Sequence, residues 1–528
     1  MNDGKKLNTR ASGVIAAAVM LSRLLGLVRE VLFNALFGTA AMGLFLIAFR
    51  LPNLLRDLFA EGALSTAFIT VFSQKLEKEG SASAWALASK MLTLAAIFMS
   101  AVSLLGIIFA EPLVNLLAPG FDPQDAAFTI LLTRIMYPFI LMVSLAALVM
   151  GILNSRQIFT APALASSFFN IGSIAGGVLF GWIIDPSFGP KALTGLAIGT
   201  LIGGFLQFAM QLPSLHRAGF RFRPDFRWND SGIQRTLILM VPSVIAASAV
   251  QVNVLVNSRF ASYAGAEAVT WLNSAFRLMQ LPLGVFGVAV ATITLPVVSR
   301  IAADTDTSRF GPTLGRAMRL AAFLTLPSAV GLWFLAEPVI GLIYEHGHFV
   351  KNDTLQTAFA LQCYAIGLVA YSCIKVLSPA FYAIDRNWTP MLVSFGAVGL
   401  NLLLNYLFMF RLDMGHKGLA LSTSICAILN FSTLYLLMLS PAKNLESKKF
   451  LSTLIRCAAA TVPLALTCQA VFTFGSPLLG GGDLAGRVVL LLTAILAGSA
   501  AYFASCFVLR VDETSAAFAI IKRKVLKK

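Results

Sequence analysis

The sequence predicts an all-α, polytopic membrane protein with about fourteen transmembrane helices. Of its 528 residues, 58% are hydrophobic and only 12% are charged, whereas soluble domains carry roughly 25% charged residues. Apolar stretches recur from Ala11 to Leu509, and stretches of about 18 to 25 residues are long enough to cross a hydrocarbon core of about 30 Å. They lack the short alternating pattern of a transmembrane β-barrel. The composition therefore excludes a soluble globular protein.

The apolar stretches define the spans that we expect. The first follows Lys5, Lys6 and Arg10 and continues past Arg23 and Arg29 without a small-residue cleavage site, so we expect it to be retained rather than removed as a signal peptide. The predicted spans are 12–37, 43–72, 86–110, 126–153, 160–182, 192–212, 237–262, 269–298, 318–336, 357–381, 389–409, 418–440, 451–473 and 488–509.

The loop charges orient these spans. Fourteen crossings put both termini on one side, and of the 40 Lys and Arg only Lys191, Lys351, Arg411, Lys417 and Arg487 fall in loops of the opposite side. The side of the termini includes the arginine-rich loop 216–235 and the tail 522–528. Because cytoplasmic loops are enriched in Lys and Arg, both termini are predicted to be cytoplasmic. The net charge of +16 is then explained by loop residues that orient the protein in the membrane, and no nucleic-acid partner is expected.

A short internal match suggests a duplication. Residues 48–51 (AFRL) recur as 275–278, an offset of 227, and Tyr137 meets Tyr364 at the same offset. Two six-span copies would have the same orientation, which is a transporter arrangement with the site between the halves. The predicted organisation is an N-terminal lobe 1–215, a basic cytoplasmic linker 216–236, a C-terminal lobe 237–440, and a segment 441–528 containing two additional helices and a basic tail.

Residues that commonly support catalysis are sparse. The pair His346 and His348 is a weak metal motif, and Asp304 and Asp306 form a DxD only in a polar loop. The chain has no nucleotide-binding P-loop. We expect no cofactor, no confident metal site and no enzymatic activity. Six cysteines in apolar stretches are expected to be small core residues: Cys363, Cys373, Cys426, Cys457, Cys468 and Cys506.

Several charged and polar residues lie within the spans. A charged side chain at a helix centre costs roughly 2.5–3.5 kcal/mol on insertion scales, so such residues normally face a cavity or a partner. At 100° per residue, Arg50, Asn53, Asp57 and Glu61 form a polar stripe along span 2. The other residues of this kind are Arg23, Arg29, Glu30, Arg56, Arg134, Asn273, Arg277, Gln280 and Lys375.

Two interpretations of the arginines are open. They could merely pair with Glu30, Asp57 and Glu61, and Arg23 and Arg134 could brace helices. Alternatively, Arg29, Arg50, Arg56 and Arg277 could line a hydrated cavity. Guanidinium groups suit bidentate contact with phosphate or carboxylate oxygens. Because these four arginines outnumber the three carboxylates, the sequence favours an anionic ligand.

Spans 1 and 2 carry a specific family resemblance. Residues 22–30 (SRLLGLVRE), 49–56 (FRLPNLLR) and 59–65 (FAEGALS) closely resemble the MurJ/MviN lipid II flippases. The segments 277–282 (RLMQLP) and 375–382 (KVLSPAFY) are also similar to that family. The resemblance covers essentially the whole chain and places it in the multidrug/oligosaccharidyl-lipid/polysaccharide exporter superfamily.

The resemblance implies a function and a site. It implies fourteen helices in two pseudo-twofold-related lobes, a groove for a polyprenyl tail at helices 13 and 14, and alternating access. The implied substrate is lipid II, an undecaprenyl-pyrophosphate-linked disaccharide-pentapeptide, moved to the periplasmic leaflet of the bacterial inner membrane for peptidoglycan synthesis and cell shape. A monomer is expected to suffice. By position, the implied substrate-binding residues are Arg29, Arg56, Arg277, Arg50, Arg23, Asn53 and Glu30. The supporting polar residues are Asp57, Glu61, Gln280, Asn273 and Lys375.

Departures from the family pattern bear on energy coupling. Gly43 and Gln280 replace acidic residues found in some members, which excludes a proton-coupled carboxylate at either place. Asn401 and Asn405 are weak sodium candidates, since no carboxylate is evident near them. Membrane potential alone could therefore drive transport. The alternatives are another exporter of the superfamily, for polysaccharide-linked lipids or drugs, and a polyprenyl-phosphate-dependent glycosyltransferase.

Overall fold

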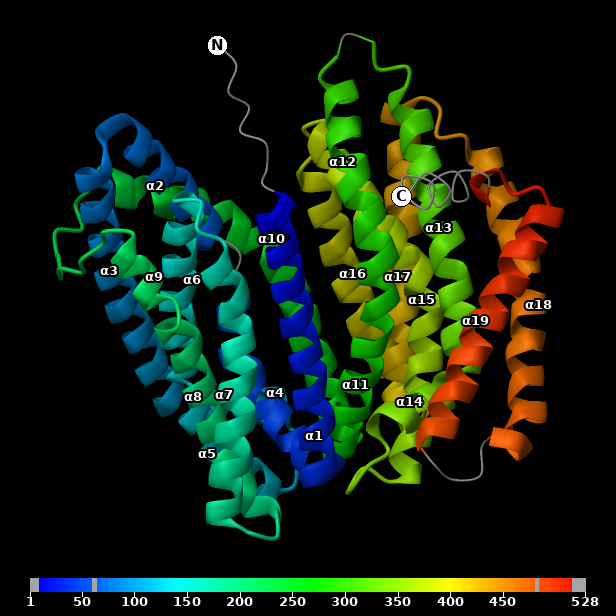
Figure 1. Ribbon diagram of the computed structural model, residues 1–528, viewed down its shortest axis with the longest axis horizontal. Coiled ribbons are helices and arrows are strands. Elements are labelled where there is room, and N and C mark those ends of the chain that lie inside the picture. The colour runs from blue at the N-terminus through cyan, green and yellow to red at the C-terminus, as the bar shows by residue number, and fades with distance from the viewer. Residues whose placement is uncertain (1–8, 59–63, 305, 480–483, 515–528) are drawn as a thin grey trace. The chain divides into compact units, whose positions relative to one another are not determined.

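The computed structural model describes residues 9–58, 64–304, 306–479 and 484–514, except for the side chains of 9–16, 243, 246 and 249. All of its regular secondary structure in these ranges is helical (Figure 1). The chain divides into two compact units. Unit 1 comprises Met1–Thr270 with His346–His348, and unit 2 comprises Trp271–Glu345 with Phe349–Lys528. The lobe boundaries expected from the duplication, near residues 215 and 237, stay a prediction.

The helices of unit 1 follow its apolar runs. They are α1 (Thr9–Leu55), α2 (Ser65–Glu79), α3 (Ser81–Ile108), α4 (Ala110–Leu117), α5 (Pro123–Met136), α6 (Phe139–Ser155), α7 (Thr160–Ile184), η2 (Pro190–Ala192), α8 (Leu193–Ala209), α9 (Leu212–Arg217) and α10 (Ser231–Tyr263). The helix α11 (Ala266–Pro282) begins in unit 1 and continues into unit 2.

Unit 2 contains the remaining helices. They are the π-helical η3 (Leu283–Val288), α12 (Ala289–Ala302), α13 (Phe310–Phe334), α14 (Ala336–Tyr344), α15 (Lys351–Ala383), α16 (Trp388–Tyr406), the π-helical η4 (Leu407–Arg411), α17 (Gly415–Ala442), α18 (Ser447–Leu479) and α19 (Leu484–Val508). The last two pack along each other and α18 packs on α13.

Twelve helical stretches in the described ranges are long and apolar enough to cross a membrane. The first, Ala17–Leu58, has 42 residues and would measure about 63 Å as an α-helix, twice the thickness of a hydrocarbon core. It contains most of the first predicted span, 12–37, and the first part of the second, 43–72, on either side of Gly38. The seventh predicted span corresponds to α10, which is not among the twelve. The chain is a multi-pass helical membrane protein, and the predicted fold class is confirmed.

The structure differs from the sequence prediction at one loop and within one span. Residues 38–42 were expected to be a loop, but the helix continues through them and only Gly38 departs from helical geometry (φ 76°, ψ 170°). Glycine adopts a positive φ without the steric cost of a Cβ, so the chain turns at one residue and needs no loop. The span 126–153 is interrupted at Tyr137 and Pro138, between α5 and α6. Proline lacks the N–H that would continue the helix.

The predicted polar stripe on span 2 assumed an uninterrupted α-helix. The helix instead becomes π-helical at Arg56–Leu58, and a π-turn holds more residues than an α-turn. The angular positions predicted for Arg56 and Asp57 on an α-helix therefore do not apply. Glu61 lies outside the described residues.

The two copies of the suspected duplication share backbone irregularities. Gly38 and Gly265, 227 positions apart, both have a positive φ at a helix junction. The π-helical turns begin at Arg56 and Leu283, again 227 apart. Such features depend on local sequence at defined places and are independent of overall hydrophobicity, so they support the duplication more strongly than the AFRL match.

A further repeated feature was missed in the sequence. The helices α3 and α4 meet at Phe109 (φ −91°, ψ 15°), and α13 and α14 meet at Leu335 (φ −100°, ψ 11°). The residues that follow are Ala-Glu-Pro in both places, at 110–112 and 336–338. The acidic residue suits the first turn of a helix, where it meets the positive end of the helix dipole.

Small residues bring α7 and α8 into close contact. A Cβ added to Gly199 would lie 2.2 Å from the backbone nitrogen of Gly177, and one added to Gly195 would lie 2.2 Å from that of Gly181. Close approach of two backbones through small residues is a common way of packing helices in membranes. These glycines therefore fix the distance between the two helices.

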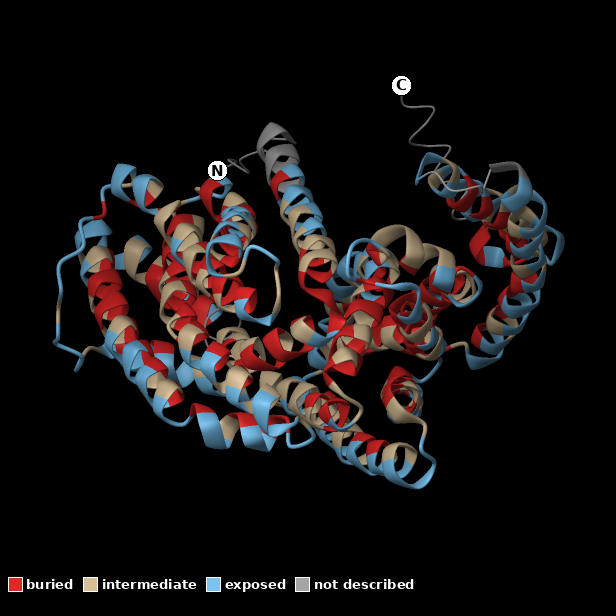
Figure 2. Cartoon of the chain, turned by 90° about the horizontal axis from the view of Figure 1, so that it is seen from below, coloured by how far each residue is buried: buried red, intermediate tan, exposed pale blue. Residues whose placement is uncertain are grey.

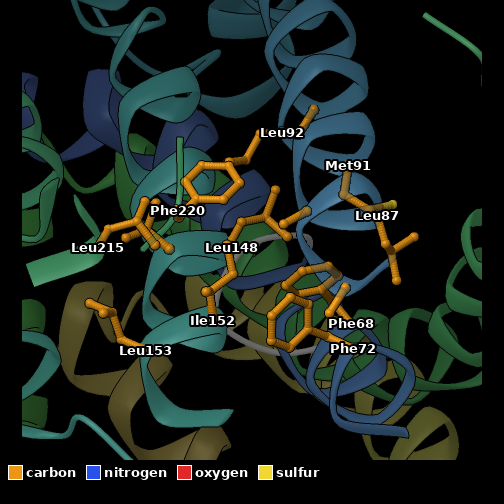
Figure 3. Packing of buried hydrophobic residues seen from close by; sticks show 14 of the residues in the cluster. Phe68, Phe72, Leu87, Met91, Leu92, Leu148, Ile152, Leu153, Leu215 and Phe220 are labelled. Atoms are coloured by element: carbon orange, nitrogen blue, oxygen red, sulfur yellow. The ribbon is translucent and has the colours of Figure 1, made fainter. Parts of the chain in front are cut away.

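The interior of unit 1 contains a large apolar cluster. Phe68 and Phe72 of α2 pack with Leu87 of α3 and Leu148 of α6, and Phe220 joins from the segment after α9 (Figure 3). Each of the four helical residues is almost completely buried. Figure 2 shows buried residues gathered between the helices and exposed residues along their outer faces, as expected where lipid replaces water around the protein.

Candidate functional site

Arg29 lies on α1 against α7. Its guanidinium carbon is 4.9 Å from the centroid of the Phe169 ring, a cation–π contact worth about 0.5–2 kcal/mol. The next residue, Asn170, donates from Nδ2 to the carbonyl oxygen of Ser22 at 3.1 Å. A Cβ on Gly26 would lie 3.8 Å from the Asn170 amide, in ordinary contact. Phe169 and Asn170 thus join α7 to α1 on both sides of Gly26 and hold the half-buried Arg29 in place.

The neighbouring face of α1 is polar and buried. Glu30 is buried, and Asn34, one turn further on, is only 1% exposed. Neither polar atom of the Asn34 side chain has a hydrogen-bond partner among the described residues. Buried amides are normally satisfied by protein or ordered water. Arg23, one of the implied substrate-binding residues, lies on the same helix and is exposed.

Arg50 and Asn53 lie in the second half of α1, and Arg56 begins the π-helical turn that follows it; all three are half-buried. Arg56 Nη2 is 2.9 Å from Asp57 Oδ1, and Gln251 of α10 donates from Nε2 to the other carboxylate oxygen at 3.3 Å. The interpretation that the arginines pair with nearby carboxylates therefore holds for Arg56. Gln251 was not predicted as a site residue. A polar side chain within the predicted span 237–262 could have indicated it.

The candidate residues of unit 2 lie on α11 and α15. Asn273 and Arg277 are half-buried and one helical turn apart, on the same side of α11. Gln280 and Lys375 are exposed. The Phe276 ring meets the Tyr364 ring edge-on at 5.3 Å between centroids, which fixes α11 against α15 next to Arg277.

The sodium candidates Asn401 and Asn405 lie between α16 and α17 and are at most 1% exposed. Asn405 Nδ2 donates to Asn401 Oδ1 at 3.0 Å, Asn401 Nδ2 donates to Ser422 Oγ at 3.4 Å, and Ser422 also bonds to Asn405. The amides thus bond to each other and to one hydroxyl. Within the described ranges, no group of three or more His, Cys, Asp or Glu could hold a metal ion.

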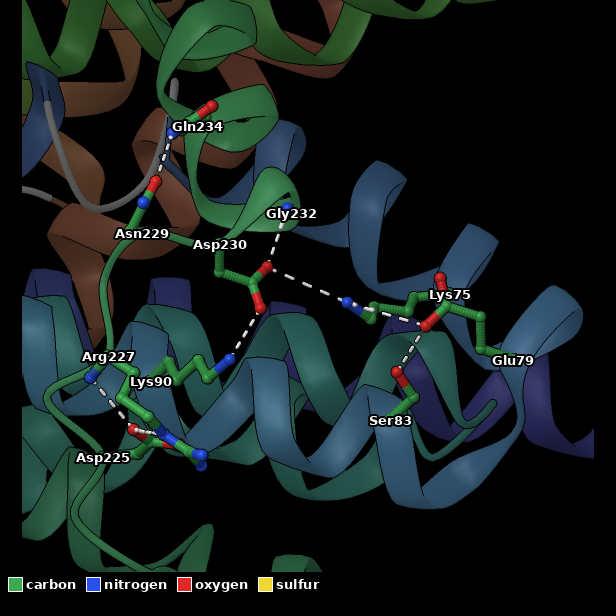
Figure 4. A network of polar contacts seen from close by, with 10 residues as sticks. All are labelled: Lys75, Glu79, Ser83, Lys90, Asp225, Arg227, Asn229, Asp230, Gly232 and Gln234. Atoms are coloured by element: carbon green, nitrogen blue, oxygen red, sulfur yellow. Dashed lines mark hydrogen bonds and ion pairs between the residues drawn. The ribbon is translucent and has the colours of Figure 1, made fainter.

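A charged cluster at the start of α10 was not found in the sequence (Figure 4). Asp230 caps α10 by accepting from Gly232 N at 2.8 Å, and its carboxylate lies 2.6 Å from Lys90 Nζ and 3.8 Å from Lys75 Nζ. Burial alone would raise the pKa of Asp230, but the hydrogen bonds from Lys90 and Gly232 and the charges of both lysines outweigh it and lower the pKa. The cluster joins α2, α3 and α10.

A second cluster surrounds the buried Arg319 of α13. Its Nη1 is 2.7 Å from Glu446 Oε2, and its Nε is 2.8 Å from Glu513 Oε1. Hydrogen bonds from Lys449 and Arg319 lower the pKa of Glu446. Glu446 directly precedes α18, and Glu513 follows α19. The cluster therefore fixes the start of α18 and the end of α19 to α13.

Comparison with known proteins identifies the family. The model of the family "Lipid II flippase MurJ" matches residues 33–481. The chain is 36% identical over 434 residues to the lipid II flippase MurJ of Burkholderia cenocepacia, covering 81% of this chain and 83% of that one. The chain belongs to the MurJ family of lipid II flippases. The probable lipid II flippase MurJ of Rickettsia prowazekii is 31% identical over 508 residues, 95% of this chain and 98% of that one.

Solved structures agree with this assignment. The structure of a lipid II flippase MurJ in an inward closed conformation matches with a TM-score of 0.75 at 27% identity, covering 97% of this chain and 99% of that one. An inward-facing multidrug resistance transporter of the MATE family matches with a TM-score of 0.67 at 16% identity, over 82% of this chain and 98% of that one. The second match shows a shared fold alone. This family consists of transporters, so the chain is a membrane transporter and not an enzyme.

Proposed function

We propose that this chain moves lipid II from the cytoplasmic to the periplasmic leaflet of the bacterial inner membrane, by alternating access, for cell-wall synthesis. The observation that carries the proposal is the presence of four half-buried arginines within apolar spans: Arg29, Arg50 and Arg56 in unit 1 and Arg277 in unit 2. Membership of the family and its named flippase relatives supply the substrate.

The proposed binding group is the pyrophosphate of the substrate. Planar guanidinium groups can engage phosphate oxygens in pairs, and an apolar environment strengthens that attraction. We assign the pyrophosphate contact to Arg29, Arg56 and Arg277, assisted by Arg50. Asn53, Glu30 and Arg23 complete the proposed substrate-binding set. Asp57, Glu61, Gln280, Asn273 and Lys375 support it as polar neighbours.

The proposed energy source follows from charge. With both termini in the cytoplasm and the cell interior negative, outward movement of an anionic group gains about 2.3 kcal/mol per charge per 100 mV. The bonded amides of Asn401 and Asn405 offer fewer open oxygen ligands than a sodium ion requires. A single chain is proposed to carry out the full cycle, with the two lobes alternating and the C-terminal helices holding the polyprenyl tail.

The proposal is tested in bacterial cells that depend on this chain. Arg29→Ala and Arg277→Ala are expected to stop growth and to trap lipid II in the cytoplasmic leaflet, because each removes a pyrophosphate contact. Arg316→Ala, at an exposed arginine of α13, serves as the matched control and should support growth. Normal growth with unimpaired lipid II export in the first two variants would overturn the site assignment. Export of another polyprenyl-linked glycan in place of lipid II would favour a different exporter of the superfamily.

A further inference from the structure

The segment between α9 and α10 displays an unusual set of side chains. Residues 221–228 read RFRPDFRW, and we call them the basic–aromatic segment. The rings of Phe222, Phe226 and Trp228 are 52%, 64% and 37% exposed. The three arginines among them are exposed as well: Arg221, Arg223 and Arg227.

The basic–aromatic segment is exposed but is attached to the rest of unit 1. Contacts with α3 hold it at three places. Before it, the buried Phe220 ring lies 5.4 Å from the Trp85 ring. Within it, the backbone nitrogen of Asp225 donates to Thr93 Oγ1 at 3.3 Å. After it, Asp230 pairs with Lys90. The segment is therefore fixed along the first turns of α3 while its rings and guanidinium groups face outward.

Local hydrogen bonds hold the outward-facing groups in position. The Asp225 carboxylate accepts from the backbone nitrogen of Arg227 at 3.0 Å and from its guanidinium Nη2 at 2.8 Å. Trp228 N donates to Phe226 O at 3.0 Å, and the two rings are 6.2 Å apart. A surface that is ordered before binding loses less conformational entropy when it binds.

The charge of this region is positive. Residues 216–235 contain five arginines and two aspartates, a net charge of +3. Both aspartates form ion pairs with basic side chains, Asp225 with Arg227 and Asp230 with Lys75 and Lys90. Because α3 is an apolar span that begins at Ser81, a segment beside its first turns lies where a membrane surface begins.

We propose that the basic–aromatic segment binds the anionic headgroups of the surrounding bilayer and inserts its rings at the headgroup level. Aromatic rings concentrate at membrane interfaces, and clustered arginines attract acidic lipids. The combination matches an acidic phospholipid surface in both charge and polarity. The proposal goes beyond lipid II transport and does not depend on it. It makes unit 1 sensitive to the acidic lipid content of the leaflet that the segment contacts.

The test uses the full-length chain in vesicles of phosphatidylcholine, with or without phosphatidylglycerol, whose acyl chains carry bromine near the headgroup. Bromine quenches nearby tryptophan fluorescence, and the difference between the chain and its Trp228→Phe variant isolates Trp228. We expect Trp228 to be quenched more strongly and shifted to the blue when phosphatidylglycerol is present. High salt should reverse part of the effect, since salt screens exposed charges.

Two variants separate charge from folding. Arg221→Gln, Arg223→Gln and Arg227→Gln together should abolish the dependence on phosphatidylglycerol. The matched control changes three other exposed arginines, Arg300→Gln, Arg309→Gln and Arg316→Gln, and should retain it. Equal quenching in both lipid mixtures would overturn the proposal and leave the surface to a protein partner. Equal behaviour of the two triple variants would also overturn it, because net charge alone would then explain the effect.

Discussion

Arg29 illustrates how a neighbouring ring can prepare a cation for its ligand. The Phe169 ring face, 4.9 Å from the guanidinium carbon, stabilises the positive charge of Arg29. Arg56 is arranged differently, because Asp57 lies 2.9 Å away. An anionic substrate must compete with that carboxylate at Arg56.

The cation–π contact between Arg29 and Phe169 predicts the effect of changing Phe169. Phe169→Leu should weaken substrate binding about two- to fivefold, since it removes a contact worth about 0.5–1 kcal/mol at a partly exposed site. Phe169→Tyr keeps the ring face and should restore normal binding. The measurement is the lipid II concentration that half-saturates transport, together with the maximal rate. If both variants raise that concentration equally, Phe169 acts only through packing.

The partners of the candidate residues were less predictable than the residues themselves. Arg29, Arg50, Arg56 and Arg277 could be selected from the sequence because a charge in an apolar span is conspicuous. Their partners could not, since Phe169 is one of 41 phenylalanines and nothing in its local sequence marks it. The pair of Arg319 and Glu513, 194 positions apart, forms only when α13, α18 and α19 pack together.

Among the helices, α7 and α8 depend on contact between glycines. Gly199→Ala should lower the thermal unfolding temperature, because its Cβ would lie 2.2 Å from Gly177 N and the backbones would have to separate. Overpacking of this kind costs about 1–3 kcal/mol. Gly396→Ala on α16 is the matched control, since its Cβ would meet nothing within 4 Å. Equal unfolding temperatures for the two variants, measured in detergent, would refute this account of the helix pair.

The start of α10 depends on the charge of Asp230. Its folded-state pKa lies below the ordinary value of 3.8. The contacts of the Asp230 carboxylate with Lys75 and Lys90 therefore stabilise the folded protein fully above about pH 5. That contribution is lost as the pH falls through the lowered pKa. Asp230→Asn keeps the helix cap and removes the charge, at a cost of about 1–3 kcal/mol.

Limited proteolysis between α9 and α10 measures this effect. At neutral pH, Asp230→Asn should be cleaved faster than the parent chain, and acidification of the parent through the lowered pKa of Asp230 should produce the same exposure. Asp185→Asn, in a different loop, is the control and should not change cleavage there. Unchanged cleavage in Asp230→Asn would contradict a charge-dependent attachment of α10.

The helices were predicted more reliably than their irregularities. Hydropathy indicates where a helix must cross lipid, and this located the apolar spans. The turn at Gly38, the π-helical turn at Arg56 and the Phe109 junction involve few residues and little change in hydropathy. They became recognisable because the second copy repeats them at Gly265, at Leu283 and at Leu335.

For the whole molecule, the duplication and the transport hypothesis belong together. Backbone irregularities repeat at an offset of 227, and arginines lie in apolar spans of both units. A membrane potential that is negative inside favours outward movement of an anionic substrate, which is the driving force that we propose. Family membership, the fold and the arginines agree on this function.

The most direct test of lipid II transport by this chain uses proteoliposomes containing the purified protein and labelled lipid II. The parent chain should accelerate movement of lipid II between leaflets relative to protein-free vesicles, and a potential that is negative on the side of origin should accelerate it further. Arg277→Ala should abolish the acceleration, and Arg316→Ala should preserve it. Equal rates in vesicles with and without the parent chain would contradict the proposed function, and full activity of Arg277→Ala would contradict the proposed site.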